Sequence, residues 1–270
     1  MLLAAGCKRP KPKVIKSPPH YNFSQSNTIK LDLKLKEISG IAWDNQKDVF
    51  LAHYDESGQL FFLDKSSLQI VDPSPYKIAG KGDFEDVTLY NGVPYMLESN
   101  GTIYKVVMDS AGVRGVMAGK IGITGTNDFE TMYADTARKA IIIICKNCDM
   151  DGKHKVSAFA FYPDSTGFVN DPVFTIDADE VARLSPFKTS KFQPSAAAIH
   201  PVLKKLFVIS SASNQLLIAD VNGKPEAVFE LGKKLFPQPE GLTFKSNGDM
   251  YISNEGVSGK GMVHRFVYKP

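Results

Sequence analysis

The chain has 270 residues, of which 43% are hydrophobic, enough to form a large buried core. Its net charge is +3, but five cations lie within the first sixteen residues and no acid precedes Asp32, so the remainder carries −2. A slightly acidic globular part with a basic tail argues against a nucleic-acid-binding surface.

The N-terminus reads MLLAAGC and continues as KRPKPKVIKSPP. An apolar run that ends in Ala-Gly-Cys resembles the lipobox of bacterial lipoproteins, in which the thiol of Cys7 would be lipidated. The match is partial, because Ala4 stands where Leu is usual and six residues are too few for a full signal. We expect residues 1–19 to be a shortened lipoprotein signal and a Lys/Pro-rich tether, and the domain to lie outside the cytoplasm. The alternative is an ordinary cysteine in a frayed terminus.

Five similar segments follow along residues 20–270, which we expect to form a single domain. Each has a short strand, a polar turn, a second strand and a polar rim, as in QPEGLTFKSNGDMYISNE from Gln238. Aligned on Ser39, Glu85, Glu130, Ser195 and Glu240, they are 46, 45, 65 and 45 residues apart. A period of roughly 45 residues with several strands per unit predicts an all-β fold, a β-propeller of five blades. A sixth, degenerate blade hidden in the long third interval is the alternative.

Two further elements complete this prediction. The last unit ends after a third strand at 262–270, and the N-terminal segment 28–42 has the same layout as 225–244. We therefore expect the N-terminal strand to supply the missing outer strand of the last blade and close the ring. Residues 177–186 begin with a capping Asp and end at a Pro, which predicts one short helix between blades three and four. It would serve as a partial lid over the channel or as a packing insert.

The innermost strand of a propeller blade runs along the central channel, so the five aligned residues should ring one mouth of it. The turn after each second strand returns to the same face. This adds His53, Asp55, Glu98, Lys146, Asn254 and Glu255 to the candidate ligand-binding residues Ser39, Glu85, Glu130, Ser195 and Glu240.

Three inner carboxylates, Glu85, Glu130 and Glu240, converge on this mouth. Like charges so close must take up protons, gain a cation or find hydrogen-bond donors. An oxygen-only set favours a hard ion such as Ca²⁺ over zinc, so these three are the candidate metal ligands. Two other roles are open: the acids cap backbone amides of the neighbouring blade, or they take part in catalysis.

Cys145 and Cys148 form a CxxC pair on the same rim. Outside the cytoplasm a local disulfide is one interpretation and a pair of free thiols is another. Zinc would need two more ligands, and His154 is the one residue nearby that could serve.

The segments FEDVTLY, FETMYAD, FQPSAAAIHP and PQPEGLTFKSNGDMYISNE resemble the SdiA-regulated family of bacterial envelope propellers, which are often lipoproteins. More distantly they are similar to phytase-like and gluconolactonase-like propellers. The resemblance covers residue 28 to the end, and it implies an acidic, metal-loaded mouth matched at Glu85, Glu130 and Glu240. Ser39 and Ser195 depart from it, because an acid there would complete the pattern. The resemblance implies no particular reaction.

We therefore expect a propeller anchored in the bacterial cell envelope by a lipid, on its periplasmic or surface side, with no other contact with the membrane. Its expected role is to bind a small molecule or an envelope protein at the acidic mouth, with Ca²⁺ as the candidate cofactor. The alternative is a metal-dependent hydrolase of phosphoesters or lactones, in which Glu85, Glu130 and Glu240 hold the metal and His53 or Lys146 assists.

Overall fold

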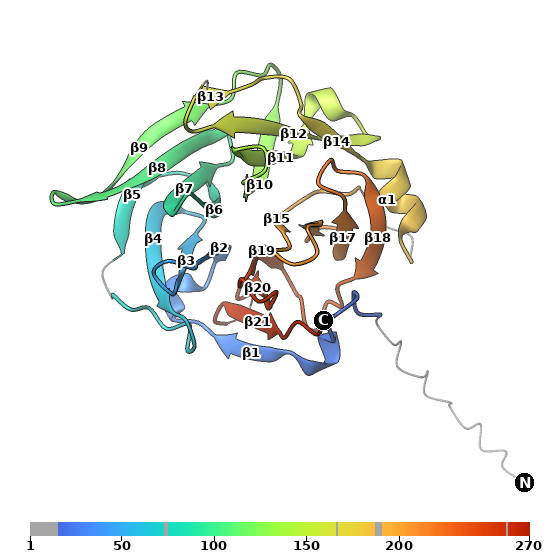
Figure 1. Ribbon diagram of the computed structural model, residues 1–270, viewed down its shortest axis with the longest axis horizontal. Coiled ribbons are helices and arrows are strands. Elements are labelled where there is room, and N and C mark those ends of the chain that lie inside the picture. The colour runs from blue at the N-terminus through green and yellow to red at the C-terminus, as the bar shows by residue number, and fades with distance from the viewer. Residues whose placement is uncertain (1–15, 73–74, 166, 187–190, 258) are drawn as a thin grey trace, which may run out of the picture.

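Five antiparallel sheets are arranged around a central axis like the blades of a propeller (Figure 1). The computed structural model describes residues 16–72, 75–165, 167–186, 191–257 and 259–270. Cys7 and its lipidation motif lie outside the described residues. The prediction of a five-bladed, all-β propeller is confirmed, and the described residues of the long third interval form two short outer strands and a helix in place of a sixth blade.

Each of the first four blades is a consecutive run of strands, numbered outward from the axis. Blade one has β2 (Ile38–Asp44), β3 (Val49–Tyr54), β4 (Ser57–Asp64) and β5 (Tyr76–Lys81). Blade two has β6 (Phe84–Tyr90), β7 (Val93–Glu98), β8 (Thr102–Asp109) and β9 (Gly112–Lys120). Blade three has β10 (Asn127–Asp135), β11 (Ala140–Cys148) and β12 (Lys155–Tyr162), and its outer edge is divided between β13 (Gly167–Phe168) and β14 (Phe174–Asp177). Blade four has β15 (Ala196–Ile199), β16 (Leu206–Ser210), β17 (Gln215–Ala219) and β18 (Pro225–Glu230).

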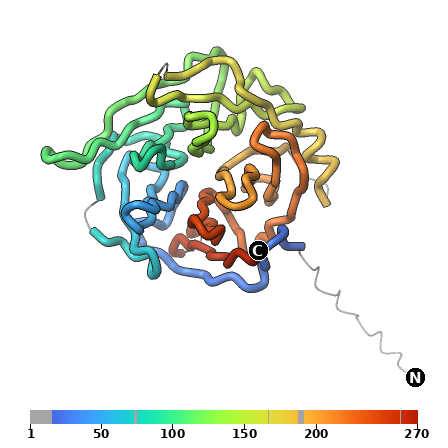
Figure 2. The backbone as a smooth tube through the Cα atoms, in the orientation of Figure 1, coloured from blue at the N-terminus to red at the C-terminus, as the bar shows by residue number. Residues whose placement is uncertain are grey.

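The fifth blade joins the two ends of the chain. It contains β19 (Pro239–Phe244), β20 (Met250–Asn254) and β21 (Met262–Phe266), and its outer strand is β1 (Asn27–Lys30). The tube in Figure 2 shows the blue N-terminal strand lying beside the red C-terminal one. The N-terminal strand therefore closes the ring, as the repeat layout predicts, and leaves β21 without an open edge.

Five hydrophobic clusters fill the spaces between neighbouring blades. The run Ile141–Ile144 shows how one strand supplies two of them. Ile142 and Ile144 face the cluster between blades three and four, whereas Ile141 and Ile143 face the cluster between blades two and three. A strand buried on both faces needs apolar, β-branched residues without alternation, which explains the four consecutive isoleucines.

Short helical segments connect or cover these sheets. They are the 3-10 turns η1 (Phe23–Gln25), η2 (Leu33–Leu35) and η3 (Asp149–Asp151), and the helix α1 (Ala178–Leu184). The side chain of Asp177 accepts a hydrogen bond from the Glu180 amide and so caps α1, as predicted. The helix buries Val181 and packs at the rim between β12 and β18 (Figure 1), so it is a packing insert and not a lid. None of the helices in the described part of the chain is long and apolar enough to cross a membrane.

Candidate functional site

A polar cavity of about 320 Å³ lies at the end of the channel where the inner strands begin. Its walls come from the first residues of β2, β6, β10 and β19, from the segments just before them, and from the ends or following turns of β3, β11 and β20. Seven carboxyl groups face one ammonium group in this cavity, which we call the acidic cavity. Its lining residues are Ser39, Asp55, Asp83, Glu85, Asp128, Glu130, Lys146, Gln238, Glu240 and Glu255.

The inner strands reach this cavity through an interruption of their pairing. The register of the inner strand with its neighbour shifts between Ile38 and Ile41, Phe84 and Asp86, Phe129 and Thr131, and Pro239 and Gly241. A β-bulge of this kind leaves an extra residue unpaired and redirects its side chain. The unpaired positions include Ser39, Glu85, Glu130 and Glu240, and all four line the cavity.

Blade four differs in where its aligned side chain lies. Ser195 precedes β15, and its amide donates a hydrogen bond to the Ile209 carbonyl oxygen at 2.8 Å although Ala196 is the residue opposite Ile209, so two residues oppose one here as well. The Ser195 hydroxyl donates to the Pro239 carbonyl oxygen at 2.9 Å and so ties blade four to blade five. Ser195 is buried and does not line the cavity, unlike the other four aligned residues.

Three other predicted residues lie outside the lining. His53 is fully buried, and its Nε2 accepts a hydrogen bond from the Gly40 amide at 3.0 Å. Burial lowers the pKa of His53 to about 4, so this imidazole is neutral at physiological pH. Asn254 is fully buried, and neither polar atom of its side chain has a partner. Glu98 accepts a hydrogen bond from the Tyr104 hydroxyl at 3.5 Å.

Three acids of the cavity bind protons more tightly than exposed acids do. Burial, followed by the nearby charge of Asp83, raises the pKa of Glu85 to about 9. Burial and Glu255 raise the pKa of Glu240 to about 7, and burial and Asp55 do the same for Glu255. The cavity therefore concentrates negative charge that water does not fully solvate, and these three carboxyl groups hold protons near neutral pH.

Lys146 is the one cation of the lining. Its ammonium group forms an ion pair with Glu130. The register between β10 and β11 passes from Asn147 directly to Cys145, so Lys146 is unpaired opposite the bulge that releases Glu130. The two bulges bring the ammonium and the carboxylate to the same wall.

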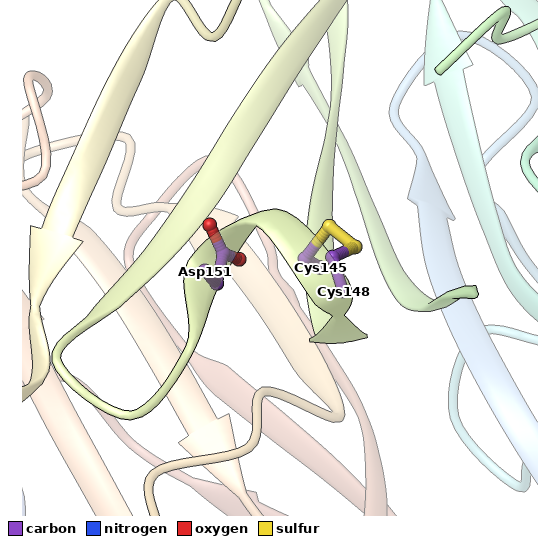
Figure 3. Close-up of side chains that lie close together, drawn as sticks. All are labelled: Cys145, Cys148 and Asp151. Carbon is purple, nitrogen blue, oxygen red and sulfur yellow. A yellow bond between two sulfur atoms is a disulfide. The ribbon is translucent and has the colours of Figure 1, made fainter. Parts of the chain in front are cut away.

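A disulfide between Cys145 and Cys148 closes the loop that carries Lys146 (Figure 3). The disulfide interpretation of the CxxC pair is thus confirmed, and both cysteines are buried. Bonded sulfurs are not free to ligate zinc. The nearby Asp151 carboxylate is occupied as well, because it accepts hydrogen bonds from the amide and the hydroxyl of Ser157.

The arrangement does not form a ready coordination shell for a metal. Within the described ranges, the one group of three His, Cys, Asp or Glu side chains with ligand atoms within 4.8 Å of one another is Cys145, Cys148 and Asp151. Ca²⁺ takes six to eight oxygens at 2.3–2.6 Å. Glu85, Glu130 and Glu240 share the cavity, but their oxygens are not gathered closely enough to serve as a preformed calcium shell.

The lining also contains residues that the repeat alignment does not single out. Asp83, Asp128 and Gln238 each stand two residues before an aligned glutamate. Side chains two residues apart on a strand share a face, so the pattern Asp-Phe-Glu at 83–85 and 128–130 is the signal that could have identified the two acids.

Fold and cavity together define a five-bladed β-propeller with an acidic channel mouth. No family model matches the chain, and no curated protein matches it. Solved structures do resemble it. A glutaminyl cyclase of Myxococcus xanthus aligns with a TM-score of 0.58 at 11% identity, over 90% of this chain and 96% of that one.

Two other solved structures show the same likeness. A gluconolactonase of Xanthomonas campestris aligns with a TM-score of 0.54 at 10% identity, over 90% of this chain and 91% of that one. A protein of unknown function from Bacteroides thetaiotaomicron aligns with a TM-score of 0.58 at 14% identity, over 85% of this chain and 58% of that one. At identities this low, the likeness shows only that the chain shares its fold with these proteins, the gluconolactonase among them. It gives no evidence that the chain shares their activity. Membership of the SdiA-regulated family stays a prediction.

Proposed function

We propose that this protein is a binding module that takes a cationic ligand into the acidic cavity. The observation that carries the proposal is the imbalance of seven carboxyl groups against one ammonium group in a cavity of about 320 Å³. Carboxylates this close repel one another, and a cation that enters relieves the repulsion and displaces the protons they hold. Ca²⁺ is the first metal to test, because the lining offers oxygen ligands.

We also propose that the module acts in the bacterial cell envelope, attached by a lipid on Cys7. The Ala-Gly-Cys sequence before a Lys/Pro-rich run supports this location. The Cys145–Cys148 disulfide supports it independently, because such bonds persist in oxidising compartments outside the cytoplasm. Labelling cells with a palmitate analogue tests the anchor: the label should appear on the protein and disappear in Cys7→Ala.

Cation binding predicts a characteristic dependence on pH. Glu240 and Glu255 have pKa values of about 7, so they lose their protons, and attract cations more strongly, as the pH rises through neutrality. Binding in a weak buffer near pH 7 should therefore release protons. A ligand at a hundred times its dissociation constant should raise the free energy of unfolding by about 2.7 kcal/mol.

The experiment is thermal unfolding at pH 6 and pH 8 with Ca²⁺, with an organic amine, and with EDTA. We expect stabilisation that is greater at pH 8 and weaker in Glu240→Gln. Unfolding curves that coincide with and without the cation at each pH would show that the acids do not bind cations and instead brace the blade junctions.

The hydrolase alternative has less support from the geometry. Hydrolysis by a bound metal needs an open coordination position and a group that assists proton transfer. His53 is buried against Gly40 outside the lining, and Lys146 is paired with Glu130. One structural neighbour is named as a gluconolactonase, so lactones are the first substrates to screen, with Ca²⁺, Mg²⁺ and Mn²⁺, and phosphoesters are screened beside them. Turnover that Glu240→Gln abolishes would favour the enzyme.

A further inference from the structure

The acidic cavity has two halves that differ in how their charge is compensated. Blades two and three supply Asp83, Glu85, Asp128, Glu130 and Lys146. In this half the Lys146 ammonium pairs with Glu130 and opposes the rise in the pKa values of Glu85 and Asp128. It also acts on Glu240 of blade five, so the protein supplies its own cation to this part of the cavity.

Apart from Glu240, the lining residues of blades one and five form a half of the cavity on which Lys146 is not seen to act. They are Ser39, Asp55, Gln238 and Glu255. Burial raises the pKa of Asp55. The charges of nearby acids raise it further, and Glu37 has the largest effect among them. Burial, followed by the charges of Asp55 and Glu37, raises the pKa of Glu255. The opposing cation is Lys36, whose side chain is half exposed and paired with Glu37.

One carboxyl oxygen in this half lacks a partner. The Asp55 carboxyl accepts a hydrogen bond from the Glu56 amide, but its Oδ1 atom is buried and accepts none from the described residues. Ser39 is 3% exposed, and its side chain lines the cavity in the same half. Buried polar groups in native proteins are normally paired, so the unpaired Oδ1 atom of Asp55 indicates that a ligand completes this wall. The Gln238 amide, by contrast, already donates to Glu255 Oε2 at 2.5 Å.

We propose that this half of the cavity binds the ammonium group of an organic amine, between Asp55, Glu255 and Ser39. An ammonium group has three donors and no acceptor, which matches a lone carboxylate oxygen, a second carboxylate and a hydroxyl. Lys146 already places an alkylammonium in the same cavity, beside Glu130. A metal ion would need ligand oxygens drawn together, and the described carboxylates are not.

This inference rests on the proposed function and adds to it the class of ligand and its position. A volume of about 320 Å³ is in the range of small-molecule sites, so the amine carries a short chain in addition to its charged group. The carboxylates of blades two and three and Lys146 would then face the rest of the ligand.

Calorimetric titration with cadaverine, a linear diamine, tests the proposal, with pentanediol as the uncharged analogue of the same length and Ca²⁺ as the metal. We expect cadaverine to bind and pentanediol not to bind. Asp55→Asn should weaken the binding of cadaverine by at least about tenfold, since it removes one charge of a partly buried pair. Ser39→Ala, which removes only the hydroxyl, should weaken it by a few-fold.

Two comparison variants distinguish an effect of contact at the proposed position from an effect of the protein's overall charge. Asp128→Asn removes one lining carboxylate beside Lys146 and should weaken binding less than Asp55→Asn does. Glu226→Gln removes an exposed acid that pairs with Lys205 away from the lining, and should leave binding unchanged. Each variant is first checked for a native circular dichroism spectrum.

Each outcome supports or overturns a defined part of the inference. If Asp128→Asn weakens binding as much as Asp55→Asn, the assigned position is wrong. If Ca²⁺ binds and cadaverine does not, the amine proposal is overturned and the proposed cation-binding function stands. If neither binds, the proposed function fails and the amine proposal fails with it.

Discussion

Glu240→Gln should make the protein more stable at high pH. Burial and Glu255 raise the pKa of Glu240 from 4.5 to about 7. Between these values the folded chain holds a proton that the unfolded chain has lost, so the free energy of unfolding falls as the pH rises from 4.5 to 7. Glutamine has nearly the same shape and no charge, and therefore avoids this loss.

The size of the effect follows from the two pKa values. A difference of one pKa unit corresponds to 1.36 kcal/mol, so the separation between about 7 and 4.5 sets a ceiling of roughly 3 kcal/mol. Glu240 is partly exposed, and solvent screening reduces the expected gain to about 2 kcal/mol at pH 8. For a chain of this size that raises the midpoint of thermal unfolding by roughly 4–8 °C relative to the wild type.

The assay is thermal unfolding followed by circular dichroism from pH 5 to pH 9, in EDTA at constant ionic strength. The gain of the variant should be small at pH 5 and should grow through pH 7. Glu226→Gln, which removes an exposed acid, is the control and should show no such trend. A gain for Glu240→Gln that is the same at pH 5 and pH 8, or a loss at both, would refute the argument that ionising this buried carboxyl destabilises the fold.

Three further predictions concern the same wall and the closure of the ring. Lys146→Met removes the charge that opposes protonation, so the pKa of Glu85 should rise above about 9, measured by carboxyl NMR titration. Replacing both Cys145 and Cys148 by Ser opens a loop with a sequence separation of 3 residues, which should lower the free energy of unfolding by roughly 2 kcal/mol in urea titrations. Removing residues 1–31 deletes β1 and exposes the edge of β21, so light scattering should show aggregation that increases with concentration, whereas removing residues 1–15 should not cause it.

Much of the architecture could be predicted from local patterns. The repeat of about 45 residues identifies the blades because each repeat is one sheet, and the shared layout of 28–42 and 225–244 identifies the closing strand. The capping Asp177 identifies the helix. The placement of acids at the channel mouth also follows from the alignment, since equivalent positions of successive blades meet around one axis.

The orientation of the polar side chains was decided only by the tertiary structure. Ser39 and Ser195 are aligned in sequence, yet Ser39 lines the cavity, whereas the Ser195 hydroxyl donates a hydrogen bond to the Pro239 carbonyl oxygen. His53 points into the packed interior, where it accepts a hydrogen bond from Gly40.

The amino-acid sequence by itself thus determined the repeat, the number of blades, the closing strand and the concentration of acids at one mouth. These features depend on the order and spacing of residues along the chain. Which acids share the cavity with Lys146 and which lack a counter-charge depends on the bulges and on the packing of blades distant in sequence. Because charge compensation is set by distance and burial in the folded chain, only the tertiary structure could divide the cavity into its two halves.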